Sequence, residues 1–144
     1  MDELTQVILT SSLTILGGII IFAITKFGEI FCANPINNLN KLKGEVGHKL
    51  VLYSNRFGNS DNLDKELMQE ASTEIRILAS ELRASVYVIK GCRFFSFFGL
   101  IEPKNNVLDA SMELIGISNS MWGSDHEAIH KRIDKIEEYL NIKT

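Results

Sequence analysis

A segment of 22 residues without a charged side chain, Leu4–Thr25, constrains this chain more than any other feature of its sequence. At about 1.5 Å per residue, a helix of this length extends roughly 33 Å, which matches the roughly 30 Å hydrocarbon core of a bilayer. All 15 lysines and arginines of the chain lie after Thr25. The segment therefore predicts a transmembrane helix.

Two other interpretations of this segment compete with a membrane span. A cleaved signal peptide usually starts with basic residues and ends at a small-x-small motif. Here Asp2 and Glu3 precede the apolar residues, and no such motif follows them. A buried core helix, the second alternative, is rarely this long without a charge. We therefore expect the membrane span.

The charges on either side of the segment predict its orientation. Acidic residues precede it, and the next basic residues along the chain are Lys26, Lys41, Lys43, Lys49 and Arg56. Lys and Arg are retained on the cytoplasmic side of a membrane. We expect a single-pass protein of the cell inner membrane, with the N-terminus outside and the C-terminal domain in the cytoplasm.

Small and polar residues recur at helical spacing within the predicted span. Thr10, Thr14 and Gly18 form a small-xxx-small ladder, which lets helix backbones approach closely in lipid. We expect homo-oligomerisation through this face or, as a sharper version, a pore that several chains line together. In the alternative interpretation the threonines only bond carbonyls of their own helix. The full face consists of Gln6, Thr10, Thr14, Gly17, Gly18 and Thr25.

The remainder of the chain predicts an all-α fold, with residues 1–31 as a transmembrane anchor and 32–144 as a cytosolic helical bundle. Asn34-Pro35 is typical of a helix start, with Asn as N-cap and Pro at the first helical position. The apolar residues that follow recur at steps of three or four as far as Phe57. A turn is expected at 58–62, and a long helix over about 63–89.

Two further helices complete a bundle of about four. Asn105 or Asn106 is expected to cap the third, and Ser124–Glu127 has the pattern of a capping box that opens the fourth. The apolar periodicity predicts which side chains point inward. They are Leu67, Ala71, Ile75, Leu78, Leu82, Val86, Val107, Leu108, Leu114, Ile115, Ile117, Ile129, Ile133, Ile136 and Leu140.

An aromatic run between the second and third of these helices contains four of the eight phenylalanines. Aromatic rings beside cations are typical of an element at the membrane surface. Runs of this kind also occur in cores and subunit interfaces, and both interpretations stay open. The residues concerned are Lys90, Arg93, Phe94, Phe95, Phe97 and Phe98.

The motif H-E-x-x-H at His126, Glu127 and His130 is the sharpest chemical pattern in the chain. On a helix it places two imidazoles on one face, where they can hold Zn²⁺ while the glutamate acts on a bound water. In the zinc proteases that it resembles, uncharged residues follow the second histidine, whereas Lys131 and Arg132 follow here. A third ligand at a familiar spacing is also missing. We expect a solvated helix start and no metal site.

A second catalytic pattern is ribonucleolytic. Helical nucleases of the HEPN superfamily carry an arginine, a polar residue and, a few residues later, a histidine. Asn119 and His126 resemble the last two, but Ser118 occupies the arginine position, so a cation for the phosphate is missing. The net charge of −3 also excludes a basic field for nucleic acid. We expect neither nucleic-acid binding nor any catalytic residue or cofactor.

One N-terminal membrane helix followed by a small helical domain resembles bacterial membrane accessory proteins of phage defence, in particular those that accompany type VI-B CRISPR nucleases. Members of that group assemble into membrane pores, so the resemblance implies a non-enzymatic, pore-forming or membrane-perturbing effector in bacterial defence. It transfers no residue roles. Two alternatives are a membrane-tethered metallohydrolase that uses the H-E-x-x-H motif and a plain anchor whose domain binds a cytosolic protein.

Overall fold

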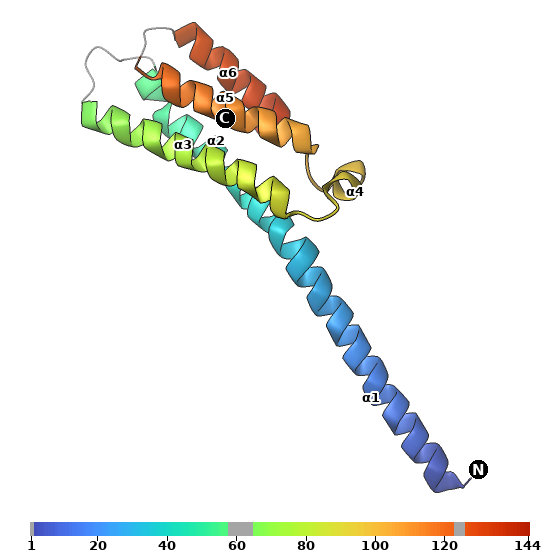
Figure 1. Cartoon of the computed structure of the whole chain (residues 1–144). Helices are drawn as coiled ribbons and strands as arrows, with labels where there is room; N and C mark the ends of the chain where they lie inside the picture. Colours follow the sequence, from blue (N-terminus) through green and yellow to red (C-terminus); the bar gives the residue numbers. More distant parts are fainter. Residues whose placement is uncertain (1, 58–64, 123–125) are drawn as a thin grey trace. The chain divides into compact units, whose positions relative to one another are not determined.

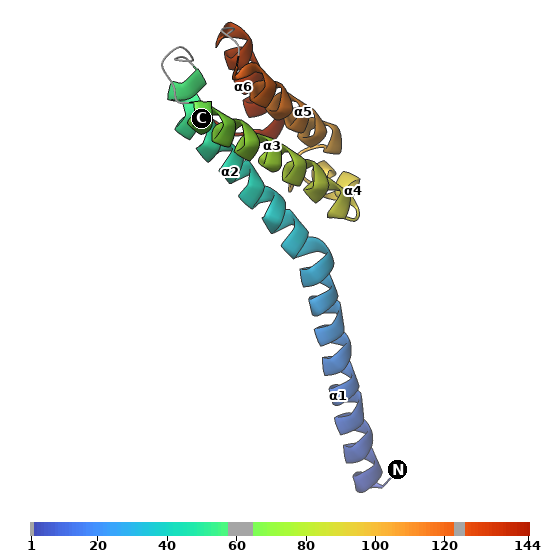
Figure 2. The same cartoon turned by 60° about the vertical axis from the view of Figure 1, so that its left-hand side comes forward.

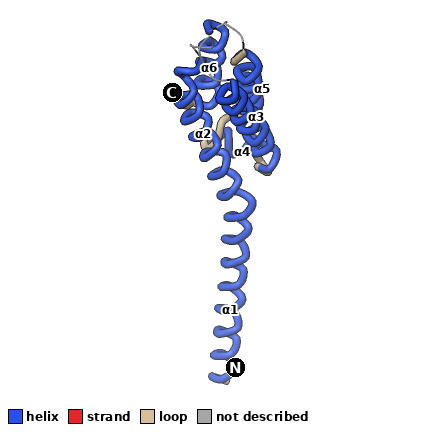
Figure 3. The backbone as a smooth tube through the Cα atoms, turned by 90° about the vertical axis from the view of Figure 1, so that its left-hand side faces the viewer, coloured by secondary structure: helices blue, strands red, loops and turns tan. Residues whose placement is uncertain are grey.

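The structure, a computed structural model, describes residues 2–57, 65–122 and 126–144, and these are helical with short connections and no strand (Figure 3). The predicted all-α fold, with one apolar N-terminal helix and a bundle of about four helices, is confirmed. The chain divides into two compact units, Met1–Asn34 and Pro35–Thr144. We call the second the helical unit. The sequence had placed this division after residue 31.

The first unit consists of α1 (Glu3–Gly28) followed by one turn of π-helix, η1 (Glu29–Ala33). The apolar residues of α1 are good helix formers or β-branched, and no proline occurs before Pro35. No residue of α1 is buried. The helix therefore lacks the packing that stabilises a core helix in water.

The predicted helix start at Asn34-Pro35 is wrong, because Asn34 itself is helical (φ −63°, ψ −47°). Proline lacks the N–H that would bond the carbonyl four residues earlier, and its ring crowds that carbonyl. A π turn precedes it, in which the Asn34 N–H donates to the Glu29 carbonyl, five residues back. Such turns accommodate local disruptions without ending a helix.

The helical unit contains α2 (Asn34–Phe57, whose first residue belongs to the first unit), α3 (Lys65–Val88), the short α4 (Cys92–Phe97), α5 (Lys104–Ser120) and α6 (His126–Leu140). Helix α5 packs between α3 and α6 (Figure 1). The turn expected at 58–62 and the cap expected at Ser124 lie outside the described residues.

The apolar faces of these helices form one core, and most inward positions are those that the periodicity predicted. Leu108, Ile115 and Ile133 are half-buried. The prediction that Leu67 points inward is wrong. Leu67 is 39% exposed, whereas its neighbour Met68 is 4% exposed. At this end of α3 the buried face begins one residue later than the prediction, because Met68, Ala71 and Ile75 follow one another at steps of three and four and are all buried.

Small residues let α3 and α5 approach closely inside the core. The hydroxyls of Ser72 and Ser118 lie 3.0 Å apart, and each also donates to the backbone carbonyl of the other residue. Ser111 donates to the Ala79 carbonyl at 2.9 Å. Because each of these buried hydroxyls has a partner, the polar atoms do not destabilise the interface.

Two ion pairs hold α2 in the helical unit. Lys49 Nζ donates to Glu74 of α3 at 2.7 Å, and the Tyr53 hydroxyl donates to the same carboxylate. The hydrogen bond to Glu74 raises the pKa of Lys49, while burial raises the pKa of Tyr53. Lys43 pairs with Glu102, which follows α4, and these side chains are only 15% and 13% exposed.

Helix α5 begins at Lys104, with Pro103 at its N-cap position (φ −53°, ψ 139°). The prediction of Asn105 or Asn106 as the cap is therefore wrong. The proline ring fixes φ but leaves ψ free, and the ψ of Pro103 lies outside the helical range, so the helix starts one residue after it. Both asparagines then lie within the first turn.

Candidate functional site

The side chains of α1 form an apolar surface that is exposed on all sides within the described structure. By length and composition, this is the one helix among the described residues that is long and apolar enough to cross a membrane. A signal sequence has the same properties. Because α1 has no buried residue, it does not match the alternative interpretation of this segment as a buried core helix.

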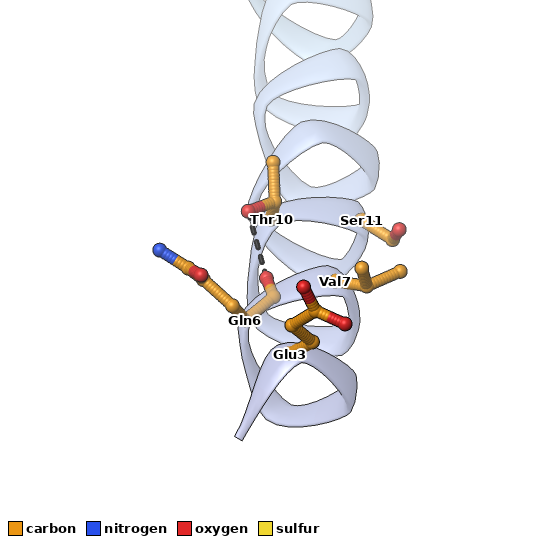
Figure 4. A pocket seen from close by; sticks show the side chains of 5 residues that line it. All are labelled: Glu3, Gln6, Val7, Thr10 and Ser11. Atoms are coloured by element: carbon orange, nitrogen blue, oxygen red, sulfur yellow. Dashed lines mark hydrogen bonds between the residues drawn. The ribbon is translucent and has the colours of Figure 1, made fainter. Parts of the chain in front are cut away.

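The threonine hydroxyls on the predicted face of α1 bond within their own helix. Thr10 Oγ1 donates to the Gln6 carbonyl at 2.8 Å (Figure 4), Thr14 Oγ1 to the Thr10 carbonyl at 2.9 Å, and Thr25 Oγ1 to the Ile21 carbonyl at 2.9 Å. This is the local bonding that the alternative interpretation expected. These donors therefore need neither water nor a second helix as a hydrogen-bond partner. The property of this face that could matter to a neighbouring helix is that its side chains are small.

Gly17 and Gly18 pack against none of the described residues. A Cβ atom built at either position would meet nothing within 4 Å. Glycine inside a helix destabilises it by about 1 kcal/mol relative to alanine. Contacts with the described residues therefore do not explain the two adjacent glycines.

Figure 4 shows the hollow at the start of α1, between Glu3, Gln6, Val7, Thr10 and Ser11. All five residues belong to one helix, so this is a surface of α1 between neighbouring side chains. It contains one carboxylate and no cation. We assign no chemistry to it.

The aromatic run folds into α4, and the structure separates its phenylalanines into two sets. Phe95 is half-buried and packs against the core, whereas Phe94, Phe97 and Phe98 are exposed. Lys90 and Arg93 are exposed as well. The sequence missed Leu100, which is also exposed and lies just after Gly99.

The histidines of the H-E-x-x-H motif lie at the start of α6. His130 and Glu127 are exposed, and Glu127 pairs with Lys131 at 2.6 Å rather than with a histidine. Across the described residues, no group of three His, Cys, Asp or Glu side chains gathers that could hold a metal ion. Ser124, the expected capping partner of Glu127, lies outside the described residues.

Asn119, from the pattern that resembles HEPN nucleases, accepts a hydrogen bond from Arg76 of α3. Arg76 Nη2 lies 2.7 Å from Asn119 Oδ1 at the exposed edge of the α3–α5 interface. A guanidinium therefore does stand beside this asparagine, although it comes from another helix. The contact holds α3 and α5 together, and we assign it no catalytic role.

Glu113 of α5 is the charged centre of the contact with α6. Arg132 Nη1 donates to Glu113 Oε2 at 2.5 Å and Lys135 Nζ to Glu113 Oε1 at 3.0 Å. Burial acts to raise the pKa of Glu113, but the hydrogen bonds and positive charges of Lys135 and Arg132 outweigh it and hold the pKa below its ordinary value of 4.5. The folded state therefore favours the ionised carboxylate.

Acid should weaken the α5–α6 contact through Glu113. A carboxyl group whose pKa is lower in the folded chain contributes stability above its ordinary value of 4.5, and this contribution is lost as the pH falls through the lower folded value. We expect Glu113→Gln to unfold at a lower temperature than wild type at pH 7, with the difference shrinking towards pH 3. Thermal unfolding in detergent at both pH values measures this, and an equal difference at both would contradict it.

In comparisons with known proteins, no family model, no curated protein and no solved structure matches the chain.

Proposed function

We propose that this chain is a non-enzymatic, single-pass membrane protein that assembles into homo-oligomers through one face of α1. The observation that carries the proposal is α1 itself, with 22 successive uncharged residues and no buried side chain. In water this apolar surface would be exposed, whereas a bilayer covers it and leaves the helical hydrogen bonds intact.

The small-residue face supports assembly. No contact with a described residue requires Gly17 or Gly18, and the Thr10 and Thr14 hydroxyls are satisfied locally. A neighbouring α1 can then approach this face without leaving the Thr10 or Thr14 hydroxyl unpaired. Assembly of several chains is also what a pore would require, because one helix cannot enclose a channel.

The flanking charges support an orientation with the N-terminus outside and the helical unit in the cytoplasm. In this proposal the helical unit is the soluble end of an effector that forms a pore in the bilayer or perturbs it. The layout resemblance to membrane proteins of phage defence supplies the biological setting. The pairing of Glu127 with Lys131 gives no support to the metallohydrolase alternative.

Membrane insertion and orientation can be tested with single cysteines. In a Cys32→Ser/Cys92→Ser background, Asp2→Cys should react with an impermeant maleimide in intact cells, and Lys143→Cys should react only after lysis. Reversed labelling would contradict the orientation that the flanking lysines predict.

Alkaline extraction separates an embedded helix from a removed signal sequence. The protein should stay in the membrane pellet with the full mass of 16.2 kDa. Because a cleaved signal leaves a shorter soluble chain, release into the supernatant with loss of the N-terminal residues would contradict the proposal.

A further inference from the structure

Helix α4 presents an unusual surface for a short helix in a bundle. Phe97 is 84% exposed, and Phe94 and Phe98 are exposed as well, whereas Cys92 and Phe95 pack on the core. Leu100 extends the same segment with another exposed apolar side chain. Contiguous exposed apolar groups of this kind mark interaction sites more often than isolated ones do.

The exposed rings are ordered before any partner binds. The ring centroids of Phe94 and Phe98 lie 4.8 Å apart, and those of Phe97 and Phe98 lie 5.4 Å apart. A glycine with positive φ bounds α4 on each side, Gly91 at 79° and Gly99 at 69°. Because the aromatic cluster is already formed, binding would cost less conformational entropy.

The stretch of sequence that contains α4 is basic. Between Glu81 and Glu102 the sequence contains no acidic residue, whereas it contains Arg83, Lys90 and Arg93. All three cations are exposed. A surface that combines exposed rings with exposed cations is complementary to anionic phospholipid, in which rings lie at the headgroup level and cations meet phosphates.

Helix α4 also lies at the end of the helical unit where α2 begins and α3 ends (Figures 1 and 2). The ion pair between Lys43 of α2 and Glu102, just after α4, fixes the segment there. The helical unit begins at Pro35, ten residues after the uncharged segment ends at Thr25. Ten residues extend at most about 36 Å, so a membrane-embedded α1 would keep this end near the bilayer.

We propose that α4 is a second, reversible membrane contact, in which Phe94, Phe97 and Phe98 enter the headgroup region of an anionic phospholipid bilayer and Lys90 and Arg93 meet its phosphates. This inference rests on the proposed function, because α1 supplies the tether. Such a tether converts weak binding by a small patch into an intramolecular event with a high effective concentration.

Tryptophan reporters in the full chain test this contact. With the single native tryptophan removed as Trp122→Phe, Phe97→Trp reports on α4 and Met112→Trp on an exposed position of α5. A third variant, Ile21→Trp, reports on α1. Each is reconstituted into vesicles with brominated acyl chains, either of phosphatidylcholine alone or with about 30% phosphatidylglycerol.

We expect the Phe97→Trp emission to be quenched at least about twofold in the anionic vesicles, while the Met112→Trp emission changes little. Adding Lys90→Gln/Arg93→Gln should reduce the quenching to the level seen in phosphatidylcholine. The matched pair Lys41→Gln/Lys131→Gln, which removes two exposed lysines elsewhere in the helical unit, should leave it unchanged.

A blue-shifted but unquenched Phe97→Trp would mean that protein covers α4, for example a second copy of the chain, and would overturn the inference. An unshifted, unquenched reporter would overturn it as well. The Ile21→Trp reporter tests the proposed function separately. If Ile21→Trp is not quenched, the proposed function is contradicted. If Ile21→Trp is quenched and Phe97→Trp is not, only the α4 contact is contradicted.

Discussion

Lys43→Met is expected to lower the free energy of unfolding of the helical unit by about 1–3 kcal/mol, because it removes one partner of a largely buried ion pair and leaves the other unsatisfied. Glu102 would be left as a buried carboxylate without its cation. Its Oε2 atom already accepts no hydrogen bond from the described residues. In a unit of this size the unfolding midpoint should fall by about 5–15 °C, as measured by differential scanning fluorimetry in detergent.

A double variant and a matched control distinguish this effect from a general loss of packing. Lys43→Met combined with Glu102→Leu should recover most of the stability, because replacing a whole buried pair by apolar residues is often neutral. Lys41→Met breaks the exposed pair with Glu45, whose side chains are 76% and 44% exposed, and should cost less than about 1 kcal/mol. Equal losses for Lys43→Met and Lys41→Met would contradict the assignment.

Thr14→Leu/Gly18→Leu should disrupt assembly while leaving membrane insertion intact. The added side chains keep α1 apolar but prevent close approach of a second helix, and we expect association to weaken at least about tenfold. A Cβ at Gly18 would meet no atom of the described residues within 4 Å, so the variant should fold normally. Cross-linking in native membranes measures the fraction of oligomer.

Ser12→Leu/Ala23→Leu is the matched control for this variant. At about 100° per residue, Ser12 and Ala23 lie on the side of α1 opposite to Thr14 and Gly18. The control adds leucines of the same size to the same helix and should assemble like the parent. Assembly of both double variants at the parental level would show that the small-residue face is not the interface.

The sequence predicted α1 and the four longer helices of the helical unit, with most of their buried faces, because these depend on local periodicity. It did not predict that the aromatic run forms the six-residue helix α4. It failed at helix ends where proline acts: Pro35 lies inside a helix after a π turn, and Pro103 occupies an N-cap position. In both cases the outcome depends on the backbone of preceding residues, which the proline residue alone does not specify.

The long-range contacts could not be predicted in this way. The pairs Lys43–Glu102 and Arg132–Glu113 and the Ser72–Ser118 hydrogen bonds join residues that are far apart in the chain. Nothing in the periodicity of one helix identifies its neighbour. By contrast, two features of the sequence indicate that α4 differs from its surroundings. One glycine precedes the phenylalanines and another follows them, and no acidic residue lies between Glu81 and Glu102.

Native mass spectrometry of the wild-type protein released from lipid nanodiscs tests the central claim most directly. We predict particles whose mass is an integer multiple, greater than one, of the full 16.2 kDa chain, each copy retaining α1. A particle of one chain would contradict assembly. A chain that lacks α1, or that does not enter the nanodisc, would contradict the membrane span.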